Sequence, residues 1–277
     1  MNLFKDLTAI ALLTLVGCSN LTSLFFYPQQ NYRVTPDFFG LEWRSVDHQT
    51  TDAVKLTSWY LPAQGESLGT VLFMHGNAQN ISTHIASVKW LPKAGYNVFL
   101  LDYREYGQSE GSAKLPQVLL DIDSALAWVV KHDQGKPIFL LGQSIGAALT
   151  SAYVPQSVYK DRIDGVILDA CLLGYQEIAR DVMSRHWLTW PLMLPSYLLP
   201  SEQDPQHHMA NISPVPLLMM HSPDDQKIPY EQGKALYELA QQPKQWLDLA
   251  GGHIQTFLFP SVRDALLDFM KEQGNSD

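Results

Sequence analysis

The sequence predicts an α/β fold with a mostly parallel sheet flanked by helices, and three observations support this prediction. Apolar runs of strand length alternate with helix-length segments from residue 70 to residue 271. Such alternation is typical of parallel strands joined by crossover helices, which cover both faces of a sheet. The pentapeptide from Gly142 to Gly146 stands between one such strand and one such helix. With 277 residues, 46% of them hydrophobic, the chain can bury one large core.

The individual elements follow from the spacing of apolar residues. Leu41–Asp47 and Ala53–Tyr60 alternate polar and apolar residues, which predicts an antiparallel pair joined by a polar turn. The later strands are expected at Thr70–Met74, Asn97–Leu101, Ile138–Leu141, Gly165–Leu168, Leu217–Met220 and Gln245–Asp248. The helices are expected near Ile81–Lys93, Leu115–Asp133, Ile145–Val154, Tyr230–Gln241 and Thr256–Lys271. Together these elements predict one domain over residues 41–273.

One segment within this domain breaks the alternation. Residues 172–213 lie between two predicted strands and are too many for an ordinary loop. The segment is rich in tryptophan, leucine, methionine and proline, so we interpret it as a short helical cap above the site. An extended connection packed on the sheet edge is the alternative.

The N-terminus has the features of a secretory signal over residues 1–17. Lys5 precedes an apolar run from Leu7 to Val16, which is too short to span a bilayer. The next residues, Gly17 and Cys18, resemble a bacterial lipobox. That resemblance implies cleavage after Gly17 and attachment of acyl chains, such as palmitate, to Cys18. A plain signal peptide or an uncleaved anchor is the alternative.

A lipobox would make this protein a lipoprotein of the bacterial cell envelope, anchored to a membrane through Cys18. Residues 18–40 would then be a tether that either packs on the domain or lies near the membrane. Ser19 resembles the sorting pattern of outer-membrane lipoproteins, which indicates the periplasmic side of that membrane in a double-membraned bacterium.

Charge and cysteine content exclude several kinds of partner. The formal net charge of −9 argues against a nucleic-acid partner and against electrostatic attraction to anionic lipid. Cys171, the second of the two cysteines, follows an apolar strand and is expected to be a buried structural thiol. His207 and His208 have no acidic or cysteine partner at ligand spacing, so we expect no metal and no cofactor.

Ser144 is the candidate nucleophile. Gly142-Gln143-Ser144-Ile145-Gly146 has the G-x-S-x-G pattern of a nucleophile elbow, in which the serine occupies a sharp turn from strand to helix. A serine hydroxyl needs a base to accept its proton, and histidine is the usual base because its pKa lies near neutral pH. His253 follows the last predicted strand in a glycine loop that can bring its imidazole to Ser144.

The histidine in turn needs a carboxylate that fixes its tautomer. Asp224 and Asp225 follow the strand Leu217–Met220, and the order serine, aspartate, histidine is the one expected in this fold. Asp169, at the end of an earlier strand, is a third candidate.

The oxyanion of an acyl-transfer intermediate needs two backbone N–H donors. Ile145 offers one at the start of the helix that follows Ser144. Asn77 can offer the second from the turn after Thr70–Met74, where Gly76 allows a close approach.

Five motifs in register resemble the α/β-hydrolase superfamily, and in particular its membrane-associated serine-aminopeptidase-like group. They are His75-Gly76-Asn77-Ala78, then Asp102-Tyr103-Arg104 with Tyr106-Gly107, Ser109 and Gly111, then Gly142 to Ala147, then His221 with Asp225 and Pro229, and finally Gly252-His253. The resemblance implies a sheet of the eight-stranded type and aligns Asp225, rather than Asp224, with the catalytic acid. Glu105 stands where the group carries glycine, so a charged side chain either lies near the pocket or is solvated. Candidates for the substrate pocket are His75, Glu105, Tyr106, Trp187 and Trp190.

The combined prediction is a serine hydrolase with a Ser144–His253–Asp225 triad and an oxyanion hole made by Asn77 and Ile145. Its substrates are expected to be small or lipid-like molecules with apolar acyl chains. The bond cleaved is expected to be an ester or a thioester, with an amide as a further option. One alternative is a membrane-tethered protein on the same fold that binds a hydrophobic ligand without catalysis, and another is a serine peptidase.

Overall fold

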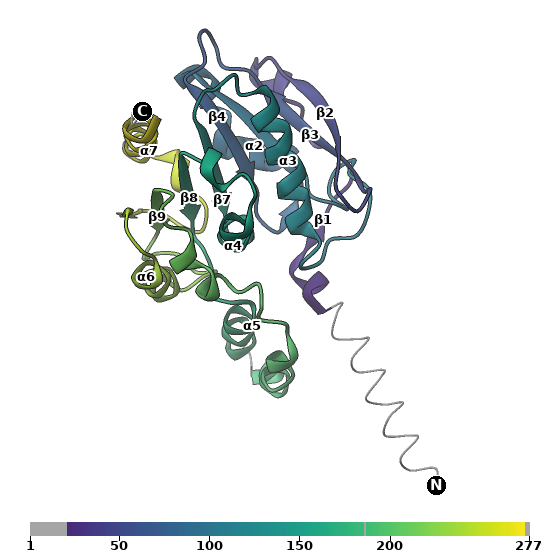
Figure 1. Cartoon of the computed structure of the whole chain (residues 1–277). Coiled ribbons are helices and arrows are strands. Elements are labelled where there is room, and N and C mark those ends of the chain that lie inside the picture. Colours follow the sequence, from purple (N-terminus) through teal and green to yellow (C-terminus); the bar gives the residue numbers. More distant parts are fainter. Residues whose placement is uncertain (1–20, 186, 275–277) are drawn as a thin grey trace.

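The computed structural model describes residues 21–185 and 187–274, and Figure 1 shows a central sheet with helices on both faces. The predicted signal peptide and Cys18 lie outside the described residues. The sheet has the strand order β10-β9-β8-β7-β4-β6-β3-β2. Its strands are β2 (Arg44–Gln49), β3 (Lys55–Leu61), β4 (Gly69–Met74), β6 (Tyr96–Leu101), β7 (Ile138–Gln143), β8 (Gly165–Asp169), β9 (Leu217–His221) and β10 (Lys244–Asp248). Only β2 with β3 and β3 with β6 pair antiparallel, so the predicted mostly parallel sheet is confirmed.

Alternate residues of each central strand belong to two separate cores. Leu72, Leu140 and Leu168 pack with α3 (Val118–His132), α4 (Ile145–Tyr153) and α6 (Tyr230–Leu239) on one face. Their neighbours along the strands, such as Phe73 and Leu141, pack with α2 (Ile81–Val88) and α7 (Pro260–Gly274) on the other face. Because both faces are covered, these strands are apolar throughout rather than alternating.

All five predicted helices are present, each is shorter than its predicted range, and three of the shifted boundaries lie near a proline. α2 ends at Val88, and Pro92 begins a separate 3-10 turn. α3 begins at Val118, after Pro116, and α7 begins at Pro260, a favoured first position because proline has no N–H to leave unpaired.

The segment after residue 20 packs on the domain. β1 (Tyr27–Pro28) pairs in parallel with β5 (Ala78–Gln79), which lies in the loop after β4. Phe26 is buried in the core that contains α3 and α4. Of the two alternatives for this tether, the described part therefore packs on the protein.

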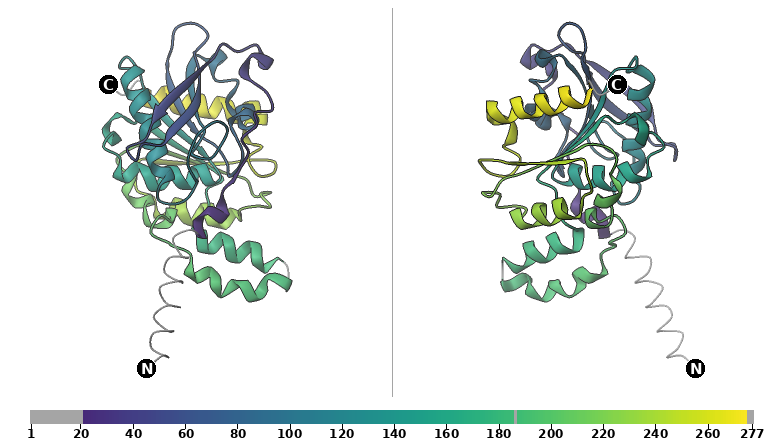
Figure 2. Two further views of the ribbon diagram at one scale, coloured as in Figure 1. Left: turned by 90° about the vertical axis from the view of Figure 1, so that its right-hand side faces the viewer. Right: turned by 60° about the vertical axis from the view of Figure 1, so that its left-hand side comes forward.

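The segment between β8 and β9 is helical rather than extended. It contains α5 (Tyr175–Ser184) and the 3-10 helices η6 (Trp187–Met193), η7 (Pro195–Leu198), η8 (Pro205–His207) and η9 (Met209–Asn211). Figure 2 shows α5 and the helical turns after it as an outermost layer, at the end of the molecule where the described chain begins. We call residues 172–213 the cap. Within the described part of the chain, none of the helices has both the length and the apolarity needed to cross a membrane.

Candidate active site

Ser144 occupies a sharp turn between β7 and α4. Its backbone has φ 57° and ψ −120°, a conformation that costs energy for any residue with a side chain. Its N–H donates to the carbonyl oxygen of Asp169 over 2.9 Å, which ties the turn to the neighbouring strand. A Cβ on Gly146 would lie 2.1 Å from the carbonyl oxygen of Met74, so only glycine allows α4 to approach β4 this closely.

Three side chains from three loops form one continuous series of hydrogen bonds. His253 Nε2 lies 3.0 Å from Ser144 Oγ, and His253 Nδ1 lies 2.7 Å from Asp225 Oδ2. Asp225 Oδ1 accepts from the N–H groups of Lys227 (2.7 Å) and Ile228 (3.0 Å), which fixes the carboxylate plane. The Asp225 side chain is 1% exposed and the His253 side chain is 18% exposed. Solvent therefore reaches the histidine but not the carboxylate.

The carboxylate of this series is held in its charged form. Burial alone would raise the pKa of Asp225, but hydrogen bonds from His221 and His253 outweigh it and lower the pKa below its usual range. His221 Nε2 lies 3.5 Å from Asp225 Oδ2 and 3.1 Å from the carbonyl oxygen of Ile228. An ionised Asp225 can therefore orient His253 and stabilise its protonated form.

The two other candidate acids are placed differently. Asp224 is exposed, and its backbone N–H donates to Ser222 Oγ. Asp169 is fully buried, and it accepts from Gln143 Nε2 (2.7 Å) and from Thr256 Oγ1 (2.7 and 2.8 Å). Burial raises the pKa of Asp169. Asp169 thus links the end of β7 to the loop of His253 and supports both.

The loop between β4 and α2 lies beside Ser144. A Cβ on Gly76 would be 3.9 Å from the Cβ of Ser144. Asn77 follows Gly76, and its carbonyl oxygen accepts from Tyr27 N (2.8 Å) and from Tyr106 Oη (2.5 Å). These bonds fix the plane of the peptide unit after Asn77. Ile145 is the first residue of α4, where N–H groups have no acceptor within the helix.

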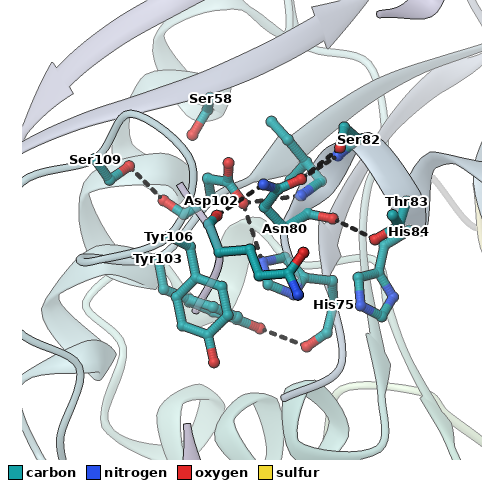
Figure 3. Close-up of polar contacts among 12 residues, drawn as sticks. Ser58, His75, Asn80, Ser82, Thr83, His84, Asp102, Tyr103, Tyr106 and Ser109 are labelled. Atoms are coloured by element: carbon teal, nitrogen blue, oxygen red, sulfur yellow. Dashed lines mark hydrogen bonds and ion pairs between the residues drawn. The ribbon is translucent and has the colours of Figure 1, made fainter. Parts of the chain in front are cut away.

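Buried polar side chains support this loop from behind (Figure 3). His75 Nδ1 lies 2.7 Å from the carbonyl oxygen of Gly76, and its Nε2 lies 3.3 Å from Asp102 Oδ1. Tyr103 donates its hydroxyl to the carbonyl oxygen of His75 (3.1 Å). The ring of His84 stacks on His75 at 4.9 Å, and burial lowers the pKa of His84 to about 3, so this ring is neutral at pH 7.

The five residues predicted for the substrate pocket lie in different surroundings. His75 and Tyr106 are completely buried, because they support the Asn77 loop from behind. Glu105 Oε2 accepts from the N–H of Ala113 (2.7 Å), so this side chain closes its own loop. Trp187 and Trp190 are 70% and 59% exposed on the cap. Burial argues against direct substrate contact for His75 and Tyr106, whereas the pocket assignment of Glu105, Trp187 and Trp190 stays a prediction.

Glu105 has φ 74°, a left-handed conformation that glycine adopts without strain. That geometry explains why glycine is the expected residue at this position of the motif. At Glu105, the hydrogen bond from the N–H of Ala113 to the side chain helps to offset the strain of this backbone conformation.

Sequence reasoning missed several residues that hold the site together. Arg104, in the second motif, is buried and bonds Asp121 through Nε (2.8 Å) and Asp52 through both terminal nitrogens (2.9 and 3.1 Å). Arg185 ties the cap to the loop of Asp225 by donating to the carbonyl oxygens of Gln226 (2.6 Å) and Lys227 (3.0 Å). No local pattern in the sequence indicated that Thr256 would bond Asp169, which lies 87 positions earlier in the chain.

Two further candidate functions have no support in the described residues. No group of three or more histidine, cysteine, aspartate or glutamate side chains is arranged there to hold a metal ion. Cys171 is buried, and burial raises the pKa of its thiol well above the usual range, so it does not form a nucleophilic thiolate.

The comparisons with known sequences identify the family. The family model for serine aminopeptidase S33 matches residues 65–211, more than half of the chain. The uncharacterized protein YfhR of Escherichia coli O157:H7 is 33% identical over 244 residues, which cover 85% of this chain and 81% of YfhR. The lysophosphatidylserine lipase ABHD12 of Danio rerio is 26% identical over 231 residues, which cover 79% of this chain and 57% of ABHD12.

Comparison with solved structures confirms the fold. The Pyrococcus furiosus esterase Pf2001 matches with a TM-score of 0.75 and 21% identity, covering 91% of this chain and 99% of that one. Together with the eight-stranded sheet and the sequence matches, this shows that the chain belongs to the α/β-hydrolase superfamily, in its serine aminopeptidase S33 family.

Proposed function

We propose that this protein is a serine hydrolase that transfers the acyl group of an ester or thioester to water. The observation that carries the proposal is the series of hydrogen bonds from Ser144 through His253 to Asp225. Nucleophile, base and acid are in contact. Of the base and the acid, His253 is the more accessible to solvent.

The reaction has two halves. Ser144 Oγ attacks the carbonyl carbon while His253 Nε2 takes its proton, and the N–H groups of Asn77 and Ile145 bind the resulting oxyanion. Collapse of this intermediate breaks the bond to the leaving alcohol or thiol, which receives the proton from His253. A water molecule, deprotonated by His253, then attacks the acyl-enzyme, and the carboxylic acid leaves as Ser144 is regenerated.

We expect the substrates to carry apolar acyl chains and to be located at a membrane. The cap is rich in exposed tryptophan and leucine. A relative is a lysophosphatidylserine lipase, which suggests a lysophospholipid-like ester here. Acylation of Cys18 in the lipobox-like sequence would hold the enzyme at a membrane of the bacterial cell envelope, close to such substrates.

Labelling with a fluorophosphonate probe tests the catalytic assignment. The folded wild-type protein should label at Ser144, and Ser144→Ala should not, at an unchanged melting temperature. An absence of labelling in folded wild-type protein would contradict the proposal, and capture of a hydrophobic ligand without turnover would favour the binding-protein alternative.

A substrate panel tests the reaction class. We expect hydrolysis of p-nitrophenyl esters and acyl thioesters, with rates that rise with acyl length. Turnover of aminoacyl amides without turnover of esters would instead identify a peptidase.

A further inference from the structure

Large apolar side chains are exposed along the outer part of the cap. Six of these side chains, in η6, in η7 and at the residue that joins them, are 59% to 77% exposed. They are Trp187, Leu188, Trp190, Leu194, Tyr197 and Leu198. We call these six residues the cap face. Large apolar side chains exposed close together in the sequence indicate a binding surface, because exposing them to water is unfavourable.

The six residues of the cap face carry no charge of their own, and the charged group that a ring contact places near them is Arg180, 4.5 Å from the ring centre of Tyr197. Residues 187–201 contain no aspartate, glutamate, lysine or arginine, although 17% of the chain is charged. Tryptophan and tyrosine, with an apolar ring and one polar atom, concentrate at the boundary between lipid and water. The net charge of −9 gives no attraction to anionic headgroups, so contact with a membrane would depend on apolar burial.

The described chain begins beside the cap. Residues Leu21–Phe25 form a 3-10 helix in which Leu24 is 63% exposed. The ring of Phe25 packs against Tyr175, the first residue of α5, at 5.0 Å. Figure 2 shows both segments at the same end of the molecule. The cap and the N-terminal segment are therefore neighbours.

The length of chain before Leu21 limits how far this end can be from an anchor. Three residue steps separate Leu21 from Cys18, and an extended chain spans at most about 3.6 Å per residue, or roughly 11 Å in all. An acylated Cys18 would therefore keep Leu21, and with it the end of the molecule that carries the cap, close to the lipid headgroups.

We propose that the cap face, together with the exposed Leu24 of the neighbouring N-terminal segment, docks on the lipid bilayer, inserting its tryptophan and leucine side chains at the interface. The substrate class follows from this geometry, and this part rests on the proposed function. The enzyme would take single-chain acyl esters from the bilayer on which its cap rests, so that the acyl chain is not transferred through water.

Quenching of tryptophan fluorescence tests the docking itself. The full-length acylated protein is reconstituted in phosphatidylcholine vesicles with or without bromine on the acyl chains. We expect brominated lipid to quench the wild-type fluorescence, and Trp187→Phe/Trp190→Phe to lose most of that quenching. Trp43→Phe/Trp246→Phe, which removes two tryptophans of the sheet region, is the matched control and should keep the quenching.

Two results would overturn the docking proposal. One is equal quenching in the Trp187→Phe/Trp190→Phe variant and its control, or no quenching of the vesicle-bound wild type. The other is a dimer in detergent that the Leu194→Ser/Leu198→Ser variant abolishes, because the cap face would then bind a second copy of the chain.

Turnover separates this proposal from the proposed function. Leu194→Ser/Leu198→Ser should lower hydrolysis of a vesicle-borne lysophospholipid at least about tenfold, because two apolar side chains leave the interface. Its hydrolysis of water-soluble p-nitrophenyl acetate should stay within twofold of wild type. Equal rates on vesicles would contradict the substrate inference, whereas absence of all esterase activity with intact quenching would contradict only the proposed function.

Discussion

Replacement of Tyr106 by phenylalanine tests whether the loop of Asn77 is held in place from behind. The hydroxyl of Tyr106 donates to the carbonyl oxygen of Asn77 over 2.5 Å and lies 3.2 Å from the N–H of Tyr27. Tyr106 is completely buried, so water does not replace the lost hydroxyl. The substitution removes the bond to Asn77 and the longer one that the hydroxyl accepts from Tyr27 N, and it leaves the bond from Tyr27 N to the carbonyl oxygen of Asn77 in place.

The magnitude follows from the bond to Asn77, because Tyr27 N keeps Asn77 O as its acceptor. One buried hydrogen bond contributes about 1 kcal/mol to folding, which corresponds to a fall in Tm of about 2–4 °C in a protein of this size. Losing an oxyanion donor altogether lowers kcat about 10²–10³-fold, so a loop that is only displaced should lower kcat about tenfold. KM should change little, because the oxyanion forms only after substrate binding.

The assay is steady-state hydrolysis of a p-nitrophenyl ester, together with a thermal melt. Tyr153→Phe is the matched control, since it removes a buried hydroxyl that donates to Asp123 (2.8 Å) away from the site. The control should lose stability without losing kcat. A Tyr106→Phe enzyme with reduced Tm and unchanged kcat would refute the positioning role.

Three further changes test other parts of the site. Asp225→Asn keeps the loop bonds but presents an amide to His253, so kcat should fall about 10⁴-fold at nearly unchanged Tm; a loss below tenfold would contradict the triad. Gly146→Ala places a Cβ 2.1 Å from Met74 O and should cost about 3 kcal/mol or more in chemical denaturation, whereas wild-type stability would disprove the clash. Burial raises the pKa of Asp204 to about 6, so its ionisation should reduce stability as pH rises from about 4 to 6, and Asp204→Asn should flatten that part of the Tm profile; parallel profiles would exclude this cause.

The sequence was informative wherever the physical signal was local. Apolar runs predicted the parallel strands because both faces of those strands are buried. Ser144 was identified by the flanking glycines that its strained turn requires, and the structure brings His253 and Asp225 to it from the loops where they were expected.

The sequence was uninformative where the signal is a contact between distant short segments. β1 and β5 have two residues each, too few to show any alternation, and they join positions about fifty residues apart. His75 and Tyr106 were predicted to line the pocket, and the structure buries both side chains completely. The Tyr106 hydroxyl lies against the N-terminal segment, 3.2 Å from Tyr27 N, a contact that no local pattern encodes.

If Cys18 is acylated as proposed, the pairing of β1 with β5 has a consequence for release of the protein from the membrane. A protease that cuts between Cys18 and Leu21 would free a protein whose Tyr27 still bonds the loop beside Ser144. A cut after Pro28, some ten residues later, would also free the protein but would remove that bond along with the anchor. The position of the cut within residues 18–28 would therefore decide whether the released protein keeps or loses its hydrogen bond to the loop beside Ser144.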